Sequence, residues 1–328
     1  MTRSSTPLLD LLKNYKHENN KPIRGADIGK VLQHKYDSLL DLLPTSSDPA
    51  IFDSDSFISF NKEIKTSDNK GKEKIPLFHS KLKEFVSTDF DLTTFGLLPP
   101  KSVNDQICRV SVMLPNGPEL AVLIIALISK GYCVAPINPT ATEDEIYSEV
   151  CSTQSRVIFV LTGASISANN IAINAASRAN IGVATVTPTG FISGLFKVAL
   201  LHPIPSISTK IIGNNNTSSY EQHYDRTVLL LHTSGTSGNK KLVPYSLHML
   251  VVGVGCIIQS WRLGTSDVCL NMMPLFHIGG IVRNVLSPIL AGGSVIACSG
   301  FDPLLFWDIL VMQPDLVTWY DTISKYVQ

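Results

Sequence analysis

The stretch "LLLHTSGTSGNKKLVPYS", residues 229–246, decides the fold of this sequence. Three leucines typical of a buried strand run directly into a segment rich in glycine and hydroxyl groups, which ends on two lysines. Glycines let backbone N–H groups converge on an anion, hydroxyl groups add donors, and lysine supplies positive charge. The pattern therefore indicates a phosphate-binding loop between the end of a parallel strand and the next helix, at the carboxyl edge of a sheet.

Three other interpretations of this loop fit the sequence less well. A Walker A loop is excluded, because that pattern has a glycine immediately before its lysine, whereas here Asn239 stands before Lys240 and Lys240 before Lys241. A flexible linker is disfavoured, because loops this short between strongly periodic elements rarely carry so many glycines and hydroxyls without a use. Ser237 and Lys240 also satisfy the S-x-x-K pattern of serine β-lactamases, and Ser67, Asp68 and Asn69 satisfy S-D-N. However, the two patterns stand in the wrong order and no K-T-G exists, which disfavours an acyl-serine hydrolase.

Around this loop, short apolar runs alternate with segments of helical length from Ile107 onward. Runs of four to eight apolar or β-branched residues that alternate with helices are typical of a doubly wound, mostly parallel α/β fold. Ser246 is a candidate N-cap for the helix after the loop, residues 187–224 are expected to be loop-rich, and the first hundred residues to be irregular. The predicted strands are residues 107–114, 132–137, 156–162, 182–187, 227–232, 268–273, 294–298 and 315–320. The predicted helices are residues 117–131, 141–152, 167–181, 246–261, 279–293 and 301–313.

Composition excludes several classes of partner. The 328 residues include 27 basic and 27 acidic side chains, and this zero net charge argues against nucleic acid or an anionic membrane as partner. We expect no transmembrane segment, because the best apolar runs, residues 120–128 and 250–258, are about half of the ~20 residues that a span requires. Six scattered cysteines without a CxxC pair predict buried, reduced thiols and no metal site. With no targeting signal, we expect a cytoplasmic protein, with an organelle such as the peroxisome left open.

The loop sequence resembles the phosphate-loop signature of the AMP-forming adenylating superfamily, which contains acyl-CoA synthetases, luciferases and the adenylation domains of peptide synthetases. Lys240 and Leu242 depart from the signature, where proline and glycine are usual. Residues 272–296 and 114–146 are similar to two further family segments, and residues 49–64 match more weakly. The resemblance predicts an extension over residues 1–48 and a partial N-terminal domain of an adenylate-forming enzyme over residues 49–328. The residues that match the signature are Thr233, Ser234, Gly235, Thr236, Ser237, Gly238 and Lys241.

The resemblance implies a two-step reaction in which a carboxylic acid and ATP give an acyl-adenylate and pyrophosphate, and a thiol then takes the acyl group. The thiol would belong to CoA or to the pantetheine of a carrier protein. The matching residues would bind the β- and γ-phosphates of ATP together with Mg²⁺, with Lys241 as the catalytic charge.

The segment 272–296 implies an acyl pocket that includes Phe276, His277, Gly279 and Gly280. Because no carboxylate there could pair an ammonium, we expect an uncharged fatty or aryl acid rather than an amino acid. His232 and His248 are assigned to structure, and the three tryptophans at 261, 307 and 319 to the core.

The family's later motifs are not found before Gln328. These motifs are an adenine- and Mg²⁺-binding segment, an aspartate for the ribose, a hinge, and a lid with the adenylation lysine. We therefore expect an incomplete fragment that cannot complete the adenylation cycle alone. The alternatives are an adenylation domain that loads a carrier protein and a non-catalytic nucleotide-binding or scaffold remnant.

Overall fold

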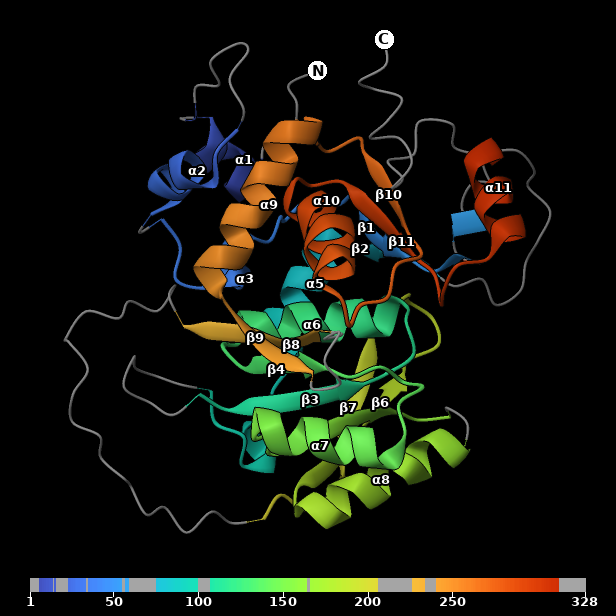
Figure 1. The fold of residues 1–328 in the computed structure, drawn as a ribbon. Coiled ribbons are helices and arrows are strands. Elements are labelled where there is room, and N and C mark those ends of the chain that lie inside the picture. The colour runs from blue at the N-terminus through green and yellow to red at the C-terminus, as the bar shows by residue number, and fades with distance from the viewer. Residues whose placement is uncertain are drawn as a thin grey trace, which may run out of the picture.

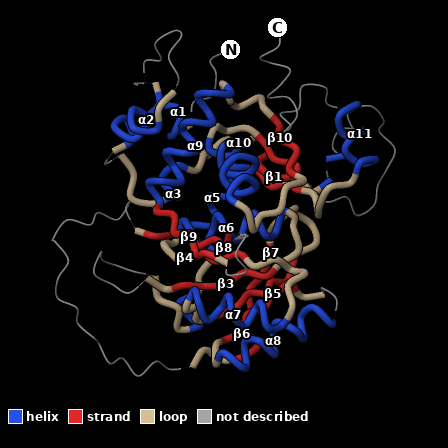
Figure 2. Tube along the Cα trace, viewed as in Figure 1, coloured by secondary structure: helices blue, strands red, loops and turns tan. Residues whose placement is uncertain are grey.

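The described residues form two sheets that share a hydrophobic core (Figure 1). The structure is a computed structural model, and it describes residues 6–13, 15, 23–33, 35–54, 57–58, 75–99, 107–163, 166–205, 226–233 and 240–312. Helices cover the outer faces of the sheets, and one helix contacts both of them (Figure 2). The predicted α/β class with doubly wound, mostly parallel sheets is confirmed.

The larger sheet has seven strands in the order β7-β6-β5-β3-β4-β8-β9. Its five inner strands are parallel, and an antiparallel strand closes each edge. The inner strands are almost continuously buried, as expected for parallel strands that are covered on both faces. The strands are β3 (Arg109–Met113), β4 (Cys133–Pro136), β5 (Val157–Leu161), β6 (Gly182–Pro188), β7 (Phe196–His202), β8 (Thr227–Thr233) and β9 (Lys241–Ser246).

The smaller sheet has four strands in the order β10-β11-β1-β2, and only β2 is antiparallel to its neighbour. This sheet joins two distant parts of the sequence, because Ile51 and Phe52 of β1 pair with Val295 and Ile296 of β11. These strands are β1 (Pro49–Phe52), β2 (Leu77–Phe78), β10 (Val268–Asn271) and β11 (Ser294–Ala297).

Helix α6 (Pro118–Ser129) contacts both sheets, through β4 and through β11. Eleven of its twelve residues are buried, which explains why its sequence is apolar on every side. Helices α7 (Glu143–Thr153) and α8 (Ile166–Ala179) pack together over the larger sheet. Helix α9 (Leu247–Trp261) follows β9, and the Ser246 side chain accepts a hydrogen bond from Met249 N–H, so the predicted N-cap is confirmed.

The first hundred residues are more regular than the sequence indicates. Their helices are α1 (Pro7–Leu12), α2 (Gly25–Leu32), α3 (Leu39–Leu42) and α5 (His79–Glu84), followed by the π-helix η1 (Phe85–Asp89) and the 3-10 helix η2 (Thr93–Phe95). Helix α1 contacts α10 and helix α2 contacts α9, so these helices extend the main core. The expectation of an irregular amino-terminal region was wrong, while the domain boundary at residue 48 stays a prediction.

Four further expectations are corrected. Strand β7 lies within the segment expected to be loop-rich. The helix predicted over residues 279–293 is mostly the π-helix η4 (Gly279–Leu286), followed by α10 (Ser287–Leu290). Trp307 on α11 (Pro303–Met312) is 61% exposed instead of packed in the core. Cys151 is exposed and Cys256 half-buried, whereas the other four cysteines are buried thiols. The strand predicted over residues 315–320 and Trp319 lie outside the described residues.

Candidate functional site

The glycine-rich loop connects β8 to the antiparallel strand β9, and not directly to a helix as the sequence suggests. Thr233 pairs with Lys241 at the loop end of this hairpin, and the Thr233 hydroxyl donates a hydrogen bond of 3.4 Å to the Lys241 carbonyl. Helix α9 begins only after β9. Ser234, Gly235, Thr236, Ser237 and Gly238 lie outside the described residues, so their role as phosphate ligands stays a prediction.

The loop end of the hairpin lies at the carboxyl edge of the parallel strands, as predicted. Strand β8 is parallel to β4, with Leu229 opposite Val134. Thr233 follows Leu229 on β8 by the same number of residues as Asn138 follows Val134 on β4. The two residues therefore lie at the same edge of the sheet. Ligands of open α/β sheets bind outside the carboxyl ends of the strands, so this edge is where a site is expected.

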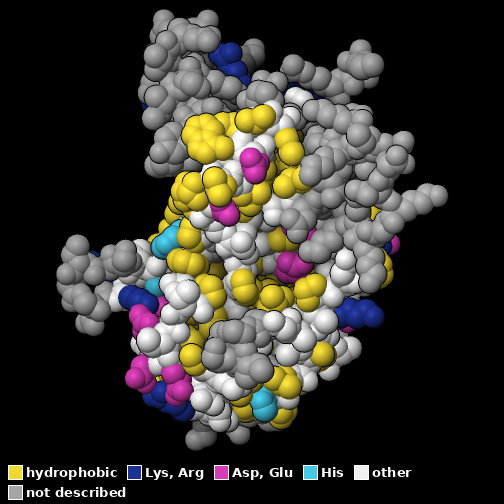
Figure 3. Space-filling model, turned by 90° about the vertical axis from the view of Figure 1, so that its right-hand side faces the viewer, with side chains coloured by type: hydrophobic (Ala, Val, Ile, Leu, Met, Phe, Trp, Pro, Cys, Tyr) yellow, Lys and Arg dark blue, Asp and Glu magenta, His cyan; other side chains and the backbone are white. Residues whose placement is uncertain are grey.

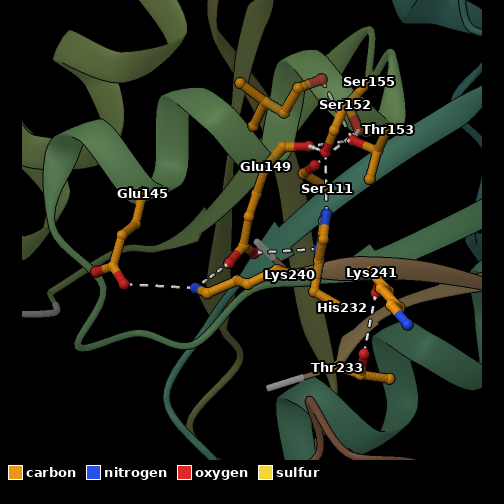
Figure 4. A network of polar contacts seen from close by, with 11 residues as sticks. Ser111, Glu145, Glu149, Ser152, Thr153, Ser155, His232, Thr233, Lys240 and Lys241 are labelled. Carbon is orange, nitrogen blue, oxygen red and sulfur yellow. Dashed lines mark hydrogen bonds and ion pairs between the residues drawn. The ribbon is translucent and has the colours of Figure 1, made fainter. Parts of the chain in front are cut away.

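The two lysines at the end of the loop have different surroundings (Figure 4). The Lys240 ammonium lies 2.8 Å from the Glu149 carboxylate and 3.4 Å from that of Glu145, both on α7. Hydrogen bonding to Glu149 raises the pKa of Lys240. The Lys241 side chain is exposed and points away from these carboxylates. Among the described residues, carboxylate partners are therefore found for Lys240 and not for Lys241, and the binding role of Lys241 stays a prediction.

His232 completes the contacts on the α7 side of the hairpin. Its Nδ1 atom lies 3.6 Å from the second carboxylate oxygen of Glu149, and its Nε2 atom 2.9 Å from the Ser152 hydroxyl. Burial lowers the pKa of His232; the Glu149 carboxylate opposes this shift and the Lys240 charge supports it, and the net direction is downward, which favours the neutral imidazole at pH 7. These contacts hold the end of β8 against α7, in line with the structural role predicted for His232.

A cavity of about 720 Å³ opens at the same edge, between the carboxyl ends of strands from both sheets. Its wall is mostly apolar, and none of the described residues that line it is charged. Its size lies within the usual range for a small-molecule site. The lining residues are Leu114, Pro115, Asn116, Leu120, Asn138, Pro139, Thr140, Leu270, Met272, Met273, Pro274, Phe276, Asn284, Ser299, Gly300, Phe301 and Phe306.

Asn116 links three of the loops that line this cavity. Its amide group donates hydrogen bonds to the carbonyls of Met273, at 3.2 Å, and Cys298, at 2.8 Å. Its side-chain oxygen accepts a hydrogen bond of 3.0 Å from Leu275 N–H. One side chain after β3 thus joins the chain after β10 to the chain after β11 beside the cavity.

The four residues predicted for the acyl pocket occupy different places. Phe276 lines the cavity, and its ring centre lies 4.6 Å from that of His277, which is exposed. A Cβ atom at Gly280 would lie 2.4 Å from the Pro274 carbonyl oxygen, so this glycine allows a close backbone approach. Gly279 faces the Arg283 side chain. Only Phe276 of the four is among the residues that line the cavity, and the binding roles of all four stay predictions.

Sequence reasoning missed most of the cavity wall. Asn116, Phe301 and Phe306 come from the ends of different strands and from α11, and no local motif marks them. Their common signal is position, because each follows a predicted parallel strand on its carboxyl side.

Within the described part of the chain, no group of three or more His, Cys, Asp or Glu side chains could hold a metal ion. No helix in this same part is both long enough and apolar enough to cross a membrane.

The comparison with known families is consistent with this geometry. The model of the AMP-binding enzyme family matches residues 105–319, which is more than half of the chain. An oxalate–CoA ligase of Arabidopsis thaliana is 28% identical over 226 residues, which cover 67% of this chain and 40% of the relative. A probable CoA ligase of Humulus lupulus, CCL9, is 30% identical over 227 residues, with 67% and 40% covered. The chain thus spans about 40% of the length of these relatives.

Solved structures show the same fold. The ATP-bound RpMatB-BxBclM chimera B1 superposes with a TM-score of 0.58 at 19% identity, over 84% of this chain and 47% of that chain. A malonyl-CoA ligase with methylmalonyl-CoA and AMP bound gives a TM-score of 0.53 at 18% identity, over 83% and 46%. The N-terminal domain of FACL13 from Mycobacterium tuberculosis gives 0.51 at 17% identity, over 74% and 55%.

Proposed function

The chain belongs to the AMP-binding enzyme family, and on this premise we propose that it forms part of an ATP-dependent acid–thiol ligase. In this reaction a carboxylate oxygen attacks the α-phosphorus of ATP and pyrophosphate leaves. A thiol, of CoA or of a carrier-bound pantetheine, then attacks the acyl carbonyl and AMP leaves. One observation carries the proposal. The exposed Lys241 lies at the end of the glycine-rich hairpin loop, and an uncharged cavity opens at the same edge of the sheet.

In this proposal the hairpin binds the β- and γ-phosphates of ATP. Charge develops on the departing pyrophosphate, so donors fixed in advance accelerate the step. Lys241 supplies the positive charge at one end of the loop, and Thr233 fixes the other end through its hydrogen bond to the Lys241 carbonyl. Removal of one such donor commonly costs about 2.7–4 kcal/mol of transition-state stabilisation.

Mg²⁺ accompanies ATP in reactions of this kind. The described residues provide no cluster of three carboxylate, histidine or cysteine ligands that fits a metal ion. In this proposal the described residues therefore contribute contacts to the phosphates of ATP rather than ligands to Mg²⁺.

The acid that we propose carries an uncharged, apolar tail, such as a fatty or aryl group. Phe276, Phe301 and Phe306 supply aromatic surface to the cavity, and the described lining contains neither a cation for a second carboxylate nor an anion for an ammonium. Burial of an unpaired charge is costly. The cavity therefore disfavours both amino acids and short diacids such as the oxalate in the name of the Arabidopsis relative.

A pair of acids of equal length tests this substrate class. By titration calorimetry, we expect the chain to bind decanoate at least tenfold more tightly than decanedioate, whose second carboxylate finds no partner. Phe301 is 69% exposed and lines the cavity, so Phe301→Lys adds a cation without disturbing the core and should raise the affinity for decanedioate. Equal binding of the two acids to the unmodified chain would refute the assignment of the tail, and binding of neither would refute the site.

A further inference from the structure

Lys240 is the second lysine of the loop, and it stands where the family signature has proline. Proline stiffens a chain through its fixed φ angle, and lysine cannot do so. The structure shows a different restraint at this position, because the Lys240 side chain is held by carboxylates of another element. Its ammonium lies 2.8 Å from Glu149 and 3.4 Å from Glu145.

The carboxylate nearest to Lys240 is almost wholly buried. Glu149 is 6% exposed and shares its two oxygens between Lys240 and His232. A buried carboxylate requires compensating partners, and removal of one partner leaves charge that water cannot solvate. The Lys240 side chain is 42% exposed, so the ion pair is buried on the Glu149 side and reached by water on the lysine side.

Glu145 is fixed in turn by the start of its own helix. Its carboxylate accepts hydrogen bonds from the backbone N–H of Thr142, at 2.9 Å, and from the Thr142 hydroxyl, at 3.0 Å. This arrangement is a capping box, which holds the first turn of α7. Both carboxylates that face Lys240 are thus placed by contacts that do not involve the loop.

We propose that Lys240 is a positioning residue whose ion pairs with Glu149 and Glu145 fix the carboxyl-terminal end of the glycine-rich loop against α7. Lys241 is thereby left as the cation that faces the phosphates. The inference rests on the proposed function of the loop, but the fixation itself is a property of the chain without nucleotide. The two lysines then have separate tasks, because one holds the loop and the other binds the ligand.

Two measurements on the full 328-residue chain separate these tasks. The first is hydrogen exchange of the β9 amides of Leu242 and Val243 without nucleotide. The second is the dissociation constant for ATP by titration calorimetry. Lys240→Met should speed exchange in β9 and weaken ATP binding about tenfold, since the loop end is released. Lys240→Arg keeps the charge and should restore both properties.

Four further variants, three single and one double, separate the two roles. Lys241→Ala should weaken ATP binding and leave β9 exchange unchanged. Glu149→Gln, which keeps the shape of the side chain, should speed β9 exchange as Lys240→Met does, and the double variant should add little to either single change. Lys197→Met, on the edge strand at the opposite side of the sheet, is the matched surface control and should change neither measurement.

The outcomes distinguish this inference from the proposed function. If Lys240→Met leaves β9 exchange unchanged, or if the effects of Lys240→Met and Glu149→Gln simply add, the positioning role is overturned. If the unmodified chain does not bind ATP but Lys240→Met still speeds β9 exchange, the fixation stands and the proposed function fails.

Discussion

Gly280 lies where the chain has no room for a side chain. A Cβ atom there would lie 2.4 Å from the Pro274 carbonyl oxygen, which is backbone and cannot move aside alone. Gly280→Ala should therefore lower the free energy of unfolding by about 1–3 kcal/mol, measured by urea denaturation. In Gly253→Ala, the matched control within α9, the nearest atom is 3.6 Å away, and stability should be unchanged or rise by up to ~1 kcal/mol. Equal effects of the two changes would contradict the close approach.

His79 should make the stability of the chain depend on pH. It is 1% exposed, its Nε2 atom lies 2.9 Å from the Gly293 carbonyl, and its Nδ1 atom has no hydrogen-bond partner among the described residues. Burial lowers the pKa of His79 in the folded state below its ordinary value of about 6.5. The unfolded chain then binds more protons between the two pKa values, so the free energy of unfolding falls as the pH drops below about 6.5.

The size of this effect is bounded by linkage. One histidine contributes at most about 1.4 kcal/mol per pH unit. Urea denaturation at pH 7.5 and pH 5.5 should show a larger loss of stability for the unmodified chain than for His79→Gln, which cannot titrate. An equal loss in the two chains would mean that His79 is not held neutral by burial.

At the scale of elements, α11 presents apolar side chains to the surface. Leu304, Trp307 and Val311 are 78%, 61% and 79% exposed, while Ile309 on the same helix is fully buried. Figure 3 views the molecule from the side of α11 and shows hydrophobic side chains gathered over this region. The helix is apolar on both faces, so the sequence alone cannot tell which face packs.

The two faces of α11 should respond differently to substitution. Trp307→Ser should change the free energy of unfolding by less than about 0.5 kcal/mol, because the ring contributes little burial. Ile309→Ala should cost about 2–5 kcal/mol through the cavity that it leaves. Thermal and urea denaturation of the two variants check this, and a large loss for Trp307→Ser would show that the ring packs against protein.

The sequence predicts the inner strands and long helices well, because their patterns are set by burial on both faces of a parallel sheet. The sequence does not predict strands β7 and β9, because both are half-exposed edge strands without a continuous apolar run. Strand β9 also contains Pro244 and Lys241, which are residue types typical of loops. The chemistry of the hairpin loop could be inferred from its residues. The Lys240–Glu149 pair and the cavity wall could not, since their members are far apart in the sequence and meet only when the strand order is known.

At the scale of the whole molecule, the helices before β1 belong to the main core. Six of their side chains are at most 2% exposed, namely Leu8, Leu12, Ile28, Leu32, Leu39 and Leu42. At roughly 1.5–3 kcal/mol for each buried side chain, they contribute on the order of 10 kcal/mol, which is comparable to the stability of a typical domain.

A chain that starts at Pro49 should therefore fail to fold cooperatively. Circular dichroism and urea denaturation of this shortened chain should show a broad transition or none, beside a sharp transition for the full chain. A shortened chain that unfolds sharply at the same urea concentration would show that residues 1–48 are a dispensable extension.

The central claim is that the hairpin with Lys241 binds the phosphates of ATP, and ATP-dependent stabilisation tests it most directly. A ligand at 100 times its dissociation constant adds about 2.7 kcal/mol to the free energy of unfolding. We predict stabilisation of this size when ATP is titrated into the unmodified chain during thermal denaturation, and its loss in Lys241→Ala. Stabilisation that survives in Lys241→Ala, or an unmodified chain whose melting temperature does not respond to ATP, would contradict the account.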